Sequence, residues 1–293
     1  MPNLVRNNLD KTNTMLRTRG LEPEIPIKSL PTLNSKLWGL HSKKLTIIGA
    51  RTSNGKSAMA LQLAWDTASQ GIPTLFLSLE MYEEDIIERL FCLAMKVDNY
   101  ELLRGNFIRY ENEWKEFERL MDDMPLVITD MLGKTWEEVD NYLQTLTKKP
   151  KVIIIDHLQE AKNAALKNKK EIIEEYLKKI RLLAIKDNFS LVICSQVNRT
   201  SQNEKTGSEP QLHHLKDSGF IEEGADIILL LHWPWNYTKE GDKNKFVLNV
   251  AKNRNGRTGW IDIKYRPECY FFYEEAEDNI RVEEKNRFGN KDE

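Results

Sequence analysis

The sequence predicts an α/β protein built on a mainly parallel sheet. Short apolar runs recur up to residue 231, and amphipathic helical patterns lie between them. Runs that are apolar throughout are typical of strands buried on both faces, as in parallel sheets covered by helices. From about residue 246 the helical patterns stop and the remaining apolar segments are joined by turns, which indicates antiparallel strands at one edge of the sheet.

Each expected strand is an apolar run bounded by polar or turn residues. The parallel strands are predicted at Leu45–Gly49, Thr74–Ser78, Leu126–Thr129, Val152–Ile155, Leu191–Cys194 and Ile227–Leu231, and the edge strands at Phe246–Ala251, Trp260–Tyr265 and Tyr270–Tyr273. The clearest helix runs from Glu171 to Asn188, where one face is apolar and the other charged. A second helix is expected from Trp136 to Lys148, with Thr135 as its N-cap.

The first 40 residues have a different character. A short charged helix is expected within Leu9–Thr18, and Pro23, Pro26 and Pro31 then interrupt the chain before the first core strand. We therefore interpret residues 1–40 as an arm, not as a domain.

Composition limits the class of protein. The chain has 293 residues, of which 40% are hydrophobic, so we expect a globular protein with one large α/β domain or two small ones. Its formal net charge of -2 excludes a generally basic nucleic-acid binder. No stretch approaches the roughly 18 apolar residues of a membrane span and the N-terminus lacks a signal-peptide core, so a cytoplasmic protein without membrane contact is expected.

The chain has three cysteines, an odd number, and they are widely spaced: Cys92, Cys194 and Cys269. This pattern predicts reduced thiols in the core, without a disulfide framework or a cysteine zinc site.

Charge is distributed unevenly along the chain. Residues 1–44 and residues 239–266 each carry eight basic side chains against three acidic ones, whereas residues 274–293 carry eight acidic and four basic side chains. On composition alone, such runs are interpreted as solvated faces.

A phosphate-binding loop follows the first predicted strand. The residues from Ala50 to Ser57 match the pattern G-x-x-x-x-G-K-[ST], except that Ala50 stands at the first glycine position. In such a loop the backbone N–H groups and the following helix N-terminus bind polyphosphate, Lys56 reaches the β- and γ-phosphates, and the Ser57 hydroxyl binds Mg²⁺. We therefore predict binding of ATP, or of another nucleoside triphosphate, together with Mg²⁺. The expected nucleotide contacts are Ala50, Arg51, Thr52, Ser53, Asn54, Gly55, Lys56, Ser57 and Ala58.

Three polar residues follow strands at the sheet edge where open α/β folds bind ligands. Asp156 ends the most apolar strand and is placed to hold Mg²⁺ directly or through water; the alternative is a helix cap. Glu80 follows the strand that ends at Ser78 and is placed to activate water, unless it only favours a helix dipole. Gln196 is an uncharged donor placed to touch the γ-phosphate, or else a simple polar turn residue.

Two further patterns are not interpreted as sites. Gly133-Lys134-Thr135 repeats the end of the phosphate-loop pattern, but Ile128 occupies its first glycine position inside a strand, so a turn and a helix cap are expected. His213 and His214 are adjacent, but no carboxylate or cysteine spacing supports a metal site, so they are expected to be loop residues.

Taken together, the motifs resemble, in order and spacing, those of the RecA-like motor domain of DnaB-type replicative helicases. They are Ser78-Leu79-Glu80-Met81, Ile153-Ile154-Ile155-Asp156-His157-Leu158-Gln159, Cys194-Ser195-Gln196-Val197-Asn198-Arg199, the segment from Leu215 to Asp226 and the segment from Ala251 to Gly259. The resemblance covers about residues 25–270 and implies a RecA-like P-loop NTPase core. Ala50 is tolerated in that family, and His157 stands where tyrosine is usual; neither departure removes a catalytic group.

The resemblance implies a role for each matching residue. Glu80 would be the catalytic base, Asp156 the Mg²⁺ carboxylate and Gln196 the γ-phosphate sensor. Lys252 and Arg254 would reach across a subunit boundary to the neighbour's nucleotide, and Arg254 would stabilise charge on the transferring phosphoryl group. Without the resemblance, Lys252 and Arg254 are interpreted as two solvated basic residues in a hairpin.

The resemblance also implies a DNA-binding loop that contains Lys216, Asp217 and Gly219. Lys216 would pair with a phosphate, and the Gly219 amide would approach the backbone of single-stranded DNA, without reading its bases. A ring that repeats such contacts needs no positive net charge.

We expect three parts in the chain. Residues 1–25 would be an arm whose helix, from Leu4 to Gly20, packs on a neighbouring subunit; residues 26–273 would be the RecA-like motor domain; and residues 274–293 would be an acidic, flexible tail. The helical domain that the family carries before the motor is not expected here, a reduction that would suit a phage protein.

The expected function is that of a homo-hexameric, ATP-driven motor that translocates on single-stranded DNA and unwinds duplex during replication, with a primase, loader or polymerase as candidate partners. The alternative is a RecA-like DNA-binding ATPase that acts as a regulator, loader or recombination accessory without processive unwinding. A small-molecule kinase is disfavoured, because no lid with clustered arginines lies between the motifs.

Overall fold

The fold is a mixed sheet of nine strands in the computed structural model, which describes residues 9, 22–162, 168–197, 209–215 and 218–275. The strand order is β3-β2-β4-β5-β1-β6-β7-β8-β9. The strands are β1 (Leu45–Ala50), β2 (Thr74–Ser78), β3 (Leu126–Asp130), β4 (Val152–Asp156), β5 (Ser190–Gln196), β6 (Ile227–His232), β7 (Lys245–Asn253), β8 (Gly259–Arg266) and β9 (Phe271–Tyr273). Pairing is parallel from β3 to β6 in that order and antiparallel from β6 to β9. The predicted fold class is confirmed, and each predicted strand is present with bounds that differ by at most two residues.

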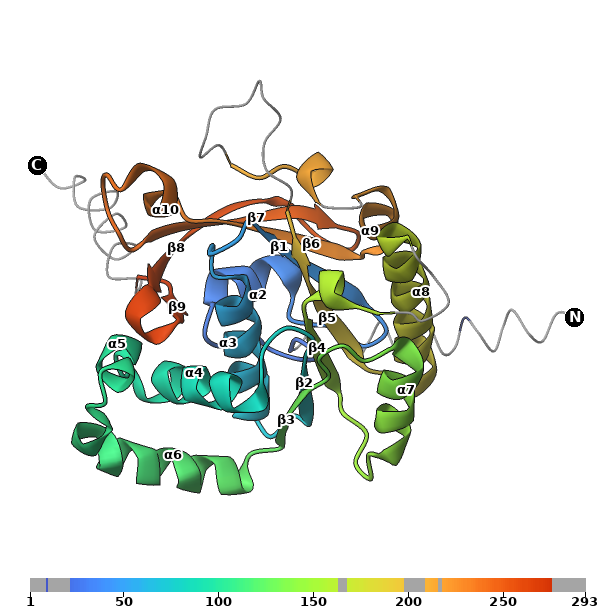
Figure 1. The fold of residues 1–293 in the computed structure, drawn as a ribbon. Coiled ribbons are helices and arrows are strands. Elements are labelled where there is room, and N and C mark those ends of the chain that lie inside the picture. Colours follow the sequence, from blue (N-terminus) through green and yellow to red (C-terminus); the bar gives the residue numbers. More distant parts are fainter. Residues whose placement is uncertain (1–8, 10–21, 163–167, 198–208, 216–217, 276–293) are drawn as a thin grey trace, which may run out of the picture.

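Helices cover both faces of the parallel part of the sheet (Figure 1). They are α2 (Pro31–Leu37), α3 (Lys56–Ala68), α4 (Glu83–Met95), α5 (Asn99–Leu103), α6 (Glu111–Asp123), α7 (Trp136–Thr145), α8 (Lys169–Asp187), α9 (Ser218–Gly224) and α10 (Trp235–Thr238), with short 3₁₀ turns at η1 (Phe107–Tyr110), η2 (Leu158–Glu160), η3 (Leu212–His214) and η4 (Pro267–Cys269). Successive side chains of a strand point to opposite faces, so Ile48 of β1 packs in the core of α2, α3 and α4, whereas Ile47 packs in the core of α7 and α8. Along the described ranges, no helix combines the length and apolarity that a membrane span needs.

Both helices predicted in detail are present. In α8 the predicted apolar stripe is buried, and Asn188 ends the helix in the left-handed conformation, with φ of 60°. At the start of α7 the Thr135 hydroxyl accepts a hydrogen bond from the backbone N–H of Glu138, and the Glu138 carboxylate accepts one from the backbone N–H of Thr135. The interpretation of Gly133-Lys134-Thr135 as a turn and helix cap is therefore confirmed, although the helix ends at Thr145, before Lys148.

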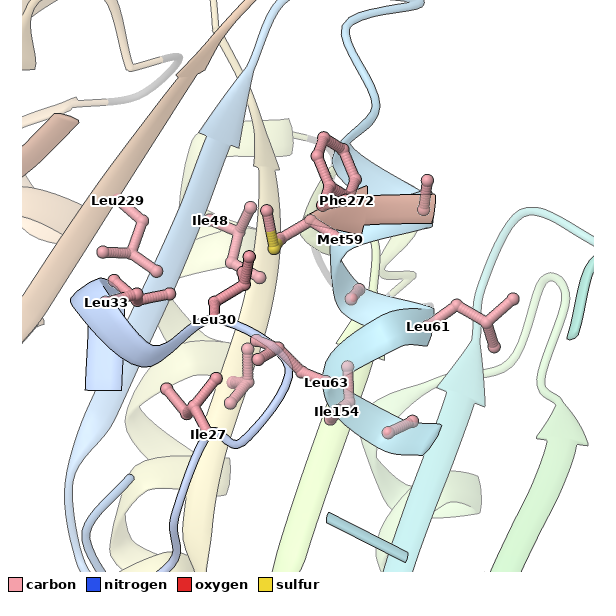
Figure 2. Packing of buried hydrophobic residues seen from close by; sticks show 14 of the residues in the cluster. Ile27, Leu30, Leu33, Ile48, Met59, Leu61, Leu63, Ile154, Leu229 and Phe272 are labelled. Atoms are coloured by element: carbon pink, nitrogen blue, oxygen red, sulfur yellow. The ribbon is translucent and has the colours of Figure 1, made fainter. Parts of the chain in front are cut away.

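The N-terminal segment joins the core earlier in the chain than expected. The interpretation of residues 1–40 as an arm is wrong from Ile25 onward, because Ile27, Leu30 and Leu33 are buried in the core that contains Ile48. Figure 2 shows Ile27, Leu30 and Leu33 beside β1, in the region between this strand and α3. The prolines concealed this, because Pro31 begins the short helix α2 instead of ending structure. The proposed arm helix lies outside the described residues apart from Leu9.

The three cysteines are free and buried. Burial raises the pKa of each thiol, to about 12 for Cys92. A thiol with a raised pKa is a poor nucleophile, so the prediction of reduced core thiols is confirmed.

Candidate nucleotide-binding site

The phosphate loop connects the end of β1 to the start of α3. Lys56 is the first residue of α3, and Gly55 caps the helix with φ of 72°. A Cβ atom at Gly55 would lie 2.8 Å from Cζ of Phe272, so both the backbone conformation and the neighbouring ring require glycine. Ala50, in contrast, has ordinary strand geometry at the end of β1, which explains why alanine can occupy the first glycine position. The free backbone N–H groups at the N-terminus of α3 therefore form an anion-binding site.

Lys56 and Asp156 meet at the centre of this site. The Lys56 Nζ lies 3.7 Å from Oδ1 of Asp156, which is longer than a hydrogen bond, and Asp156 is 3% exposed. Among the described residues Oδ1 has no hydrogen-bond partner. The Asp156 side chain caps no helix, because His157 stands at the start of η2. A buried carboxylate oxygen without a hydrogen-bond partner fits the oxygen ligands that Mg²⁺ prefers.

Glu80 faces His157 across the same site. Its Oε2 lies 2.9 Å from Nδ1 of His157, without hydrogen-bond geometry, and about half of the Glu80 side chain is exposed. Burial lowers the pKa of His157, and the charge of Lys56 adds to this, so the imidazole is neutral near neutral pH. The helix-dipole interpretation of Glu80 does not hold, because α4 begins at Glu83 and has its own acidic first turn.

Gln196 links the end of β5 to the phosphate loop. Its side-chain Nε2 donates to Oγ1 of Thr52 at 2.9 Å. Its backbone N–H donates to Oε1 of Gln159 at 2.9 Å, and Nε2 of Gln159 donates to Oγ of Ser195 at 3.0 Å. Gln159 is 1% exposed, so these contacts join η2 to β5 in the interior. Gln196 is therefore not a free turn residue.

Lys56, Glu80, His157 and Gln196 line one cavity of about 640 Å³, whereas the predicted site residue Asp156 is not part of its lining. The structure brings together there Ala50, Arg51, Thr52, Ser53, Gly55, Lys56, Ser57, Ala58, Glu80 and Gln196 from the predicted set. The sequence reasoning did not assign to the cavity Met81, Arg89, His157, Glu160, Tyr265 and Tyr270. Arg89 lies over the Tyr270 ring, 5.3 Å from its centroid, and this pair extends the cavity away from Lys56. The only sequence signal for Arg89 is its place on the inner part of the helix after Glu80.

Asn54 faces away from the cavity. Its Nδ2 donates to Oη of Tyr237 at 2.9 Å, and its Oδ1 accepts from the Trp233 backbone N–H at 3.1 Å. Asn236 of α10 donates to the Ser53 carbonyl at 3.2 Å. The Asn54 side chain fastens the loop to residues 233–237, while the prediction that Asn54 contacts the nucleotide as part of the loop stays a prediction.

Lys252 and Arg254 are not in the cavity of their own subunit. They lie where β7 turns towards β8, and both donate to backbone carbonyls at the end of α9. Of the predicted DNA-binding residues, Lys216 and Asp217 lie outside the described residues, and Gly219 lies in α9 with open space around its Cα.

A phosphate loop, a buried carboxylate and a polar strand end at the carboxyl edge of a parallel sheet define a P-loop nucleotide-binding protein. Residues 27–274 match the DnaB-like helicase C-terminal domain family, and the chain belongs to this family.

Known proteins similar to the chain agree with this assignment. A replicative DNA helicase DnaB of Leifsonia xyli subsp. xyli is 30% identical over 236 residues, which are 78% of this chain and 51% of that protein. The replicative DNA helicase DnaC of Bacillus subtilis is 26% identical over 255 residues, covering 83% of this chain and 56% of that protein. The chain thus spans about half the length of these relatives.

Two solved structures share the fold. One is described as an ATPase domain and superposes with a TM-score of 0.80 at 22% identity, covering 92% of this chain and 98% of that domain. The other is a DnaB-like replicative helicase, described with its interactions with primase. It superposes with a TM-score of 0.79 at 22% identity, covering 91% of this chain and 67% of the other.

Proposed function

We propose that the chain is the motor of an ATP-dependent DNA helicase, which hydrolyses nucleoside triphosphate at the subunit interfaces of a ring, translocates on single-stranded DNA and unwinds duplex during replication. The observation that carries the proposal is that Lys56, Glu80 and Gln196 line one cavity in a member of the DnaB-like family, with the buried Asp156 carboxylate 3.7 Å from the Lys56 Nζ. The relatives are replicative helicases, which favours this function over a regulator that does not unwind.

The residues of the cavity divide the chemistry among them. The loop N–H groups and Lys56 bind the phosphates. Ser57 and Asp156 would hold Mg²⁺, which would neutralise charge on the phosphate oxygens. Glu80 orients and deprotonates water, and neutral His157 beside it leaves the carboxylate able to accept the proton. Gln196, through Thr52, senses the γ-phosphate end. Arg89 and Tyr270 bind the far end of the nucleotide.

Lys252 and Arg254 do not line the cavity of their own subunit, so we assign them to the nucleotide of a neighbouring subunit, with Arg254 as the residue that stabilises the transition state. A site that a neighbour completes supports a homo-oligomer, and the family resemblance supports a hexameric ring.

The DNA contacts are assigned to Lys216, Asp217 and Gly219, which are close neighbours in the sequence. Backbone contacts of this kind fit binding of single-stranded DNA without base recognition. A primase is a candidate partner, since a structural neighbour was described with one, and a loader or polymerase would act on the same ring in the cytoplasm.

Two measurements test the proposal. ATP hydrolysis should rise with single-stranded DNA, and a forked duplex should be unwound; Lys56→Ala should abolish both, whereas Lys186→Ala on the exposed side of α8 should abolish neither. Hydrolysis that DNA stimulates, without strand displacement at any protein concentration, would instead favour the regulator. A native mass that remains monomeric with ATP and Mg²⁺ would exclude sites completed by a neighbour.

A further inference from the structure

The C-terminal end of α9 gathers cationic side chains from two other elements. Four consecutive backbone carbonyls, at residues 222–225, accept from three cations. The donors are Lys252 to Glu222, Arg254 to Glu223 at 2.6 Å and to Ala225 at 3.3 Å, and Arg181 to Gly224. The last carbonyls of a helix have no partners within the helix and carry partial negative charge, so these cations cap α9.

Arg181 differs from the other two because it is anchored elsewhere. It comes from α8, and its Nη2 lies 3.6 Å from the Asp226 carboxylate. Asp226 is buried and accepts from the Leu45 backbone N–H at 3.0 Å and from Lys44 at 3.3 Å. Arg181 is therefore fixed to the start of β1 and β6 whether or not α9 needs a cap.

Lys252 and Arg254 lie at the end of the β7–β8 hairpin, and their only described side-chain hydrogen bonds are those to α9. They share a small space with Arg181. Burial lowers the pKa of Lys252, the charge of Arg254 and, more weakly, that of Arg181 act in the same direction, and Glu222 and Asp226 act against them. Lys252 is therefore repelled by both arginines, and this repulsion is offset in part by the two carboxylates.

We propose that Arg181 is a positioning residue for the two cations that act on the neighbour's nucleotide. Arg181 keeps the C-terminal carbonyls of α9 hydrogen-bonded when Lys252 and Arg254 move to the neighbour's nucleotide. Before that movement, the positive charge of Arg181 weakens the hydrogen bonds of Lys252 and Arg254 to α9. Without Arg181, α9 would depend on Lys252 and Arg254 alone and would retain them. The inference rests on the proposed trans role of Arg254.

Rings assembled from two different variants make it possible to test the subunit that supplies the cations separately from the subunit that binds the nucleotide. Lys56→Ala subunits retain Arg254 but cannot hydrolyse, and Arg254→Ala subunits retain the nucleotide site but lack the cation. Each variant alone should be inactive, and mixing them before ATP is added should restore hydrolysis at the junctions where Arg254 meets an intact site.

Arg181→Ala is then placed in one partner at a time. In the Lys56→Ala partner it should reduce the restored kcat about two- to fivefold, the range expected for one helix-end charge, with KM for ATP unchanged. In the Arg254→Ala partner it should have no effect. Arg181→Lys, which keeps the charge, should recover most of the activity, and Lys179→Ala on the same helix should behave like the parent in either partner.

Each other outcome has a distinct meaning. If the parent mixture regains no activity, the trans role of Arg254 is wrong and this inference falls with it. If the mixture regains activity but Arg181→Ala is neutral in both partners, or equally harmful in both, only the role of Arg181 is overturned. Thermal unfolding of Arg181→Ala and Arg181→Lys separates an unfolded variant from a positioning defect.

Discussion

The side-chain amide of Gln196 donates to the Thr52 hydroxyl at 2.9 Å, which connects the last residue of β5 directly to the phosphate loop. The same residue is held through its backbone N–H by the buried Gln159. The position of Thr52 is therefore coupled through one hydrogen bond to the Gln196 side chain at the end of β5, just before the segment after residue 197.

Gln196→Ala should separate nucleotide binding from hydrolysis. The loop N–H groups and Lys56 remain, so affinity should change little, whereas removal of one donor near the γ-phosphate should lower kcat about 10- to 100-fold. Equilibrium binding of a fluorescent nucleotide and steady-state hydrolysis check this, with Gln144→Ala on the exposed face of α7 as the control. Hydrolysis at the parental rate would leave the contact with Thr52 only a structural role.

Gly55→Ala should cost more stability than Gly71→Ala, although both positions have positive φ, 72° and 77°. A Cβ at Gly71 meets nothing within 4 Å, whereas one at Gly55 would lie 2.8 Å from Phe272. Gly71→Ala should therefore lower the free energy of unfolding only through the strained backbone, by about 1–2 kcal/mol. Gly55→Ala should lower it further and should also abolish nucleotide binding. Urea unfolding measures both. Equal costs would mean that Phe272 moves aside freely, and Phe272→Leu in the Gly55→Ala background should relieve part of the difference.

Tyr237→Phe should loosen the phosphate loop from outside the cavity. The substitution removes the hydroxyl that accepts from Asn54 at 2.9 Å and keeps the ring stacked near His232. We expect a loss of about 0.5–1.5 kcal/mol in unfolding free energy and nucleotide affinity lower by at most about fivefold. Tyr100→Phe, at an exposed ring beside Arg104, is the matched control. An unchanged affinity together with lowered stability would limit residues 233–237 to a structural role.

His232 should make the fold less stable in acid. Burial, and then the charge of Arg51, lower its pKa from 6.5 to about 4. Between these two values the unfolded chain binds the proton and the folded chain does not, so stability falls as pH decreases from about 6.5 towards 4. The melting temperature of His232→Gln should depend less on pH in this window than that of the parent, and His41→Gln, at a half-buried position near the end of α2, serves as control. Parallel curves for parent and His232→Gln would contradict the assignment.

Local patterns were sufficient to predict the strands and the phosphate loop. The strands β1, β2, β4 and β6 are buried along their whole length and appear in the sequence as continuous apolar runs, whereas β3 at the edge of the sheet is only partly buried. The conformation of the phosphate loop follows from its own glycine and from its place between β1 and α3. The helix α2 was missed because its prolines resemble chain breaks, while its burial depends on contacts of Leu33 with distant residues such as Leu229.

The same division applies to the site. Lys56, Ser57, Glu80, Asp156 and Gln196 were predicted from the sequence to share a site, because parallel strands end at one edge of the sheet and carry their last polar residues together. Of these, Lys56, Ser57, Glu80 and Gln196 line the cavity, and Asp156 lies 3.7 Å from Lys56. Arg89, Tyr265 and Tyr270 were not, since the far end of the cavity is assembled from α4, β8 and η4, which follow no common motif.

The sequence by itself was enough to propose the residues of the nucleotide site, since the phosphate loop and the residues that end its strands are short local patterns. Which contacts the other polar residues make depends on how the chain folds in space. The Asn54 side chain bonds to Tyr237 of α10, and Lys252 and Arg254, which belong to a basic run in the composition, cap α9 beside Arg181. The physical reason is that a hydrogen bond or a helix-end charge acts over a few ångströms, between atoms that the fold brings together from distant parts of the chain, as with Arg181 and Arg254.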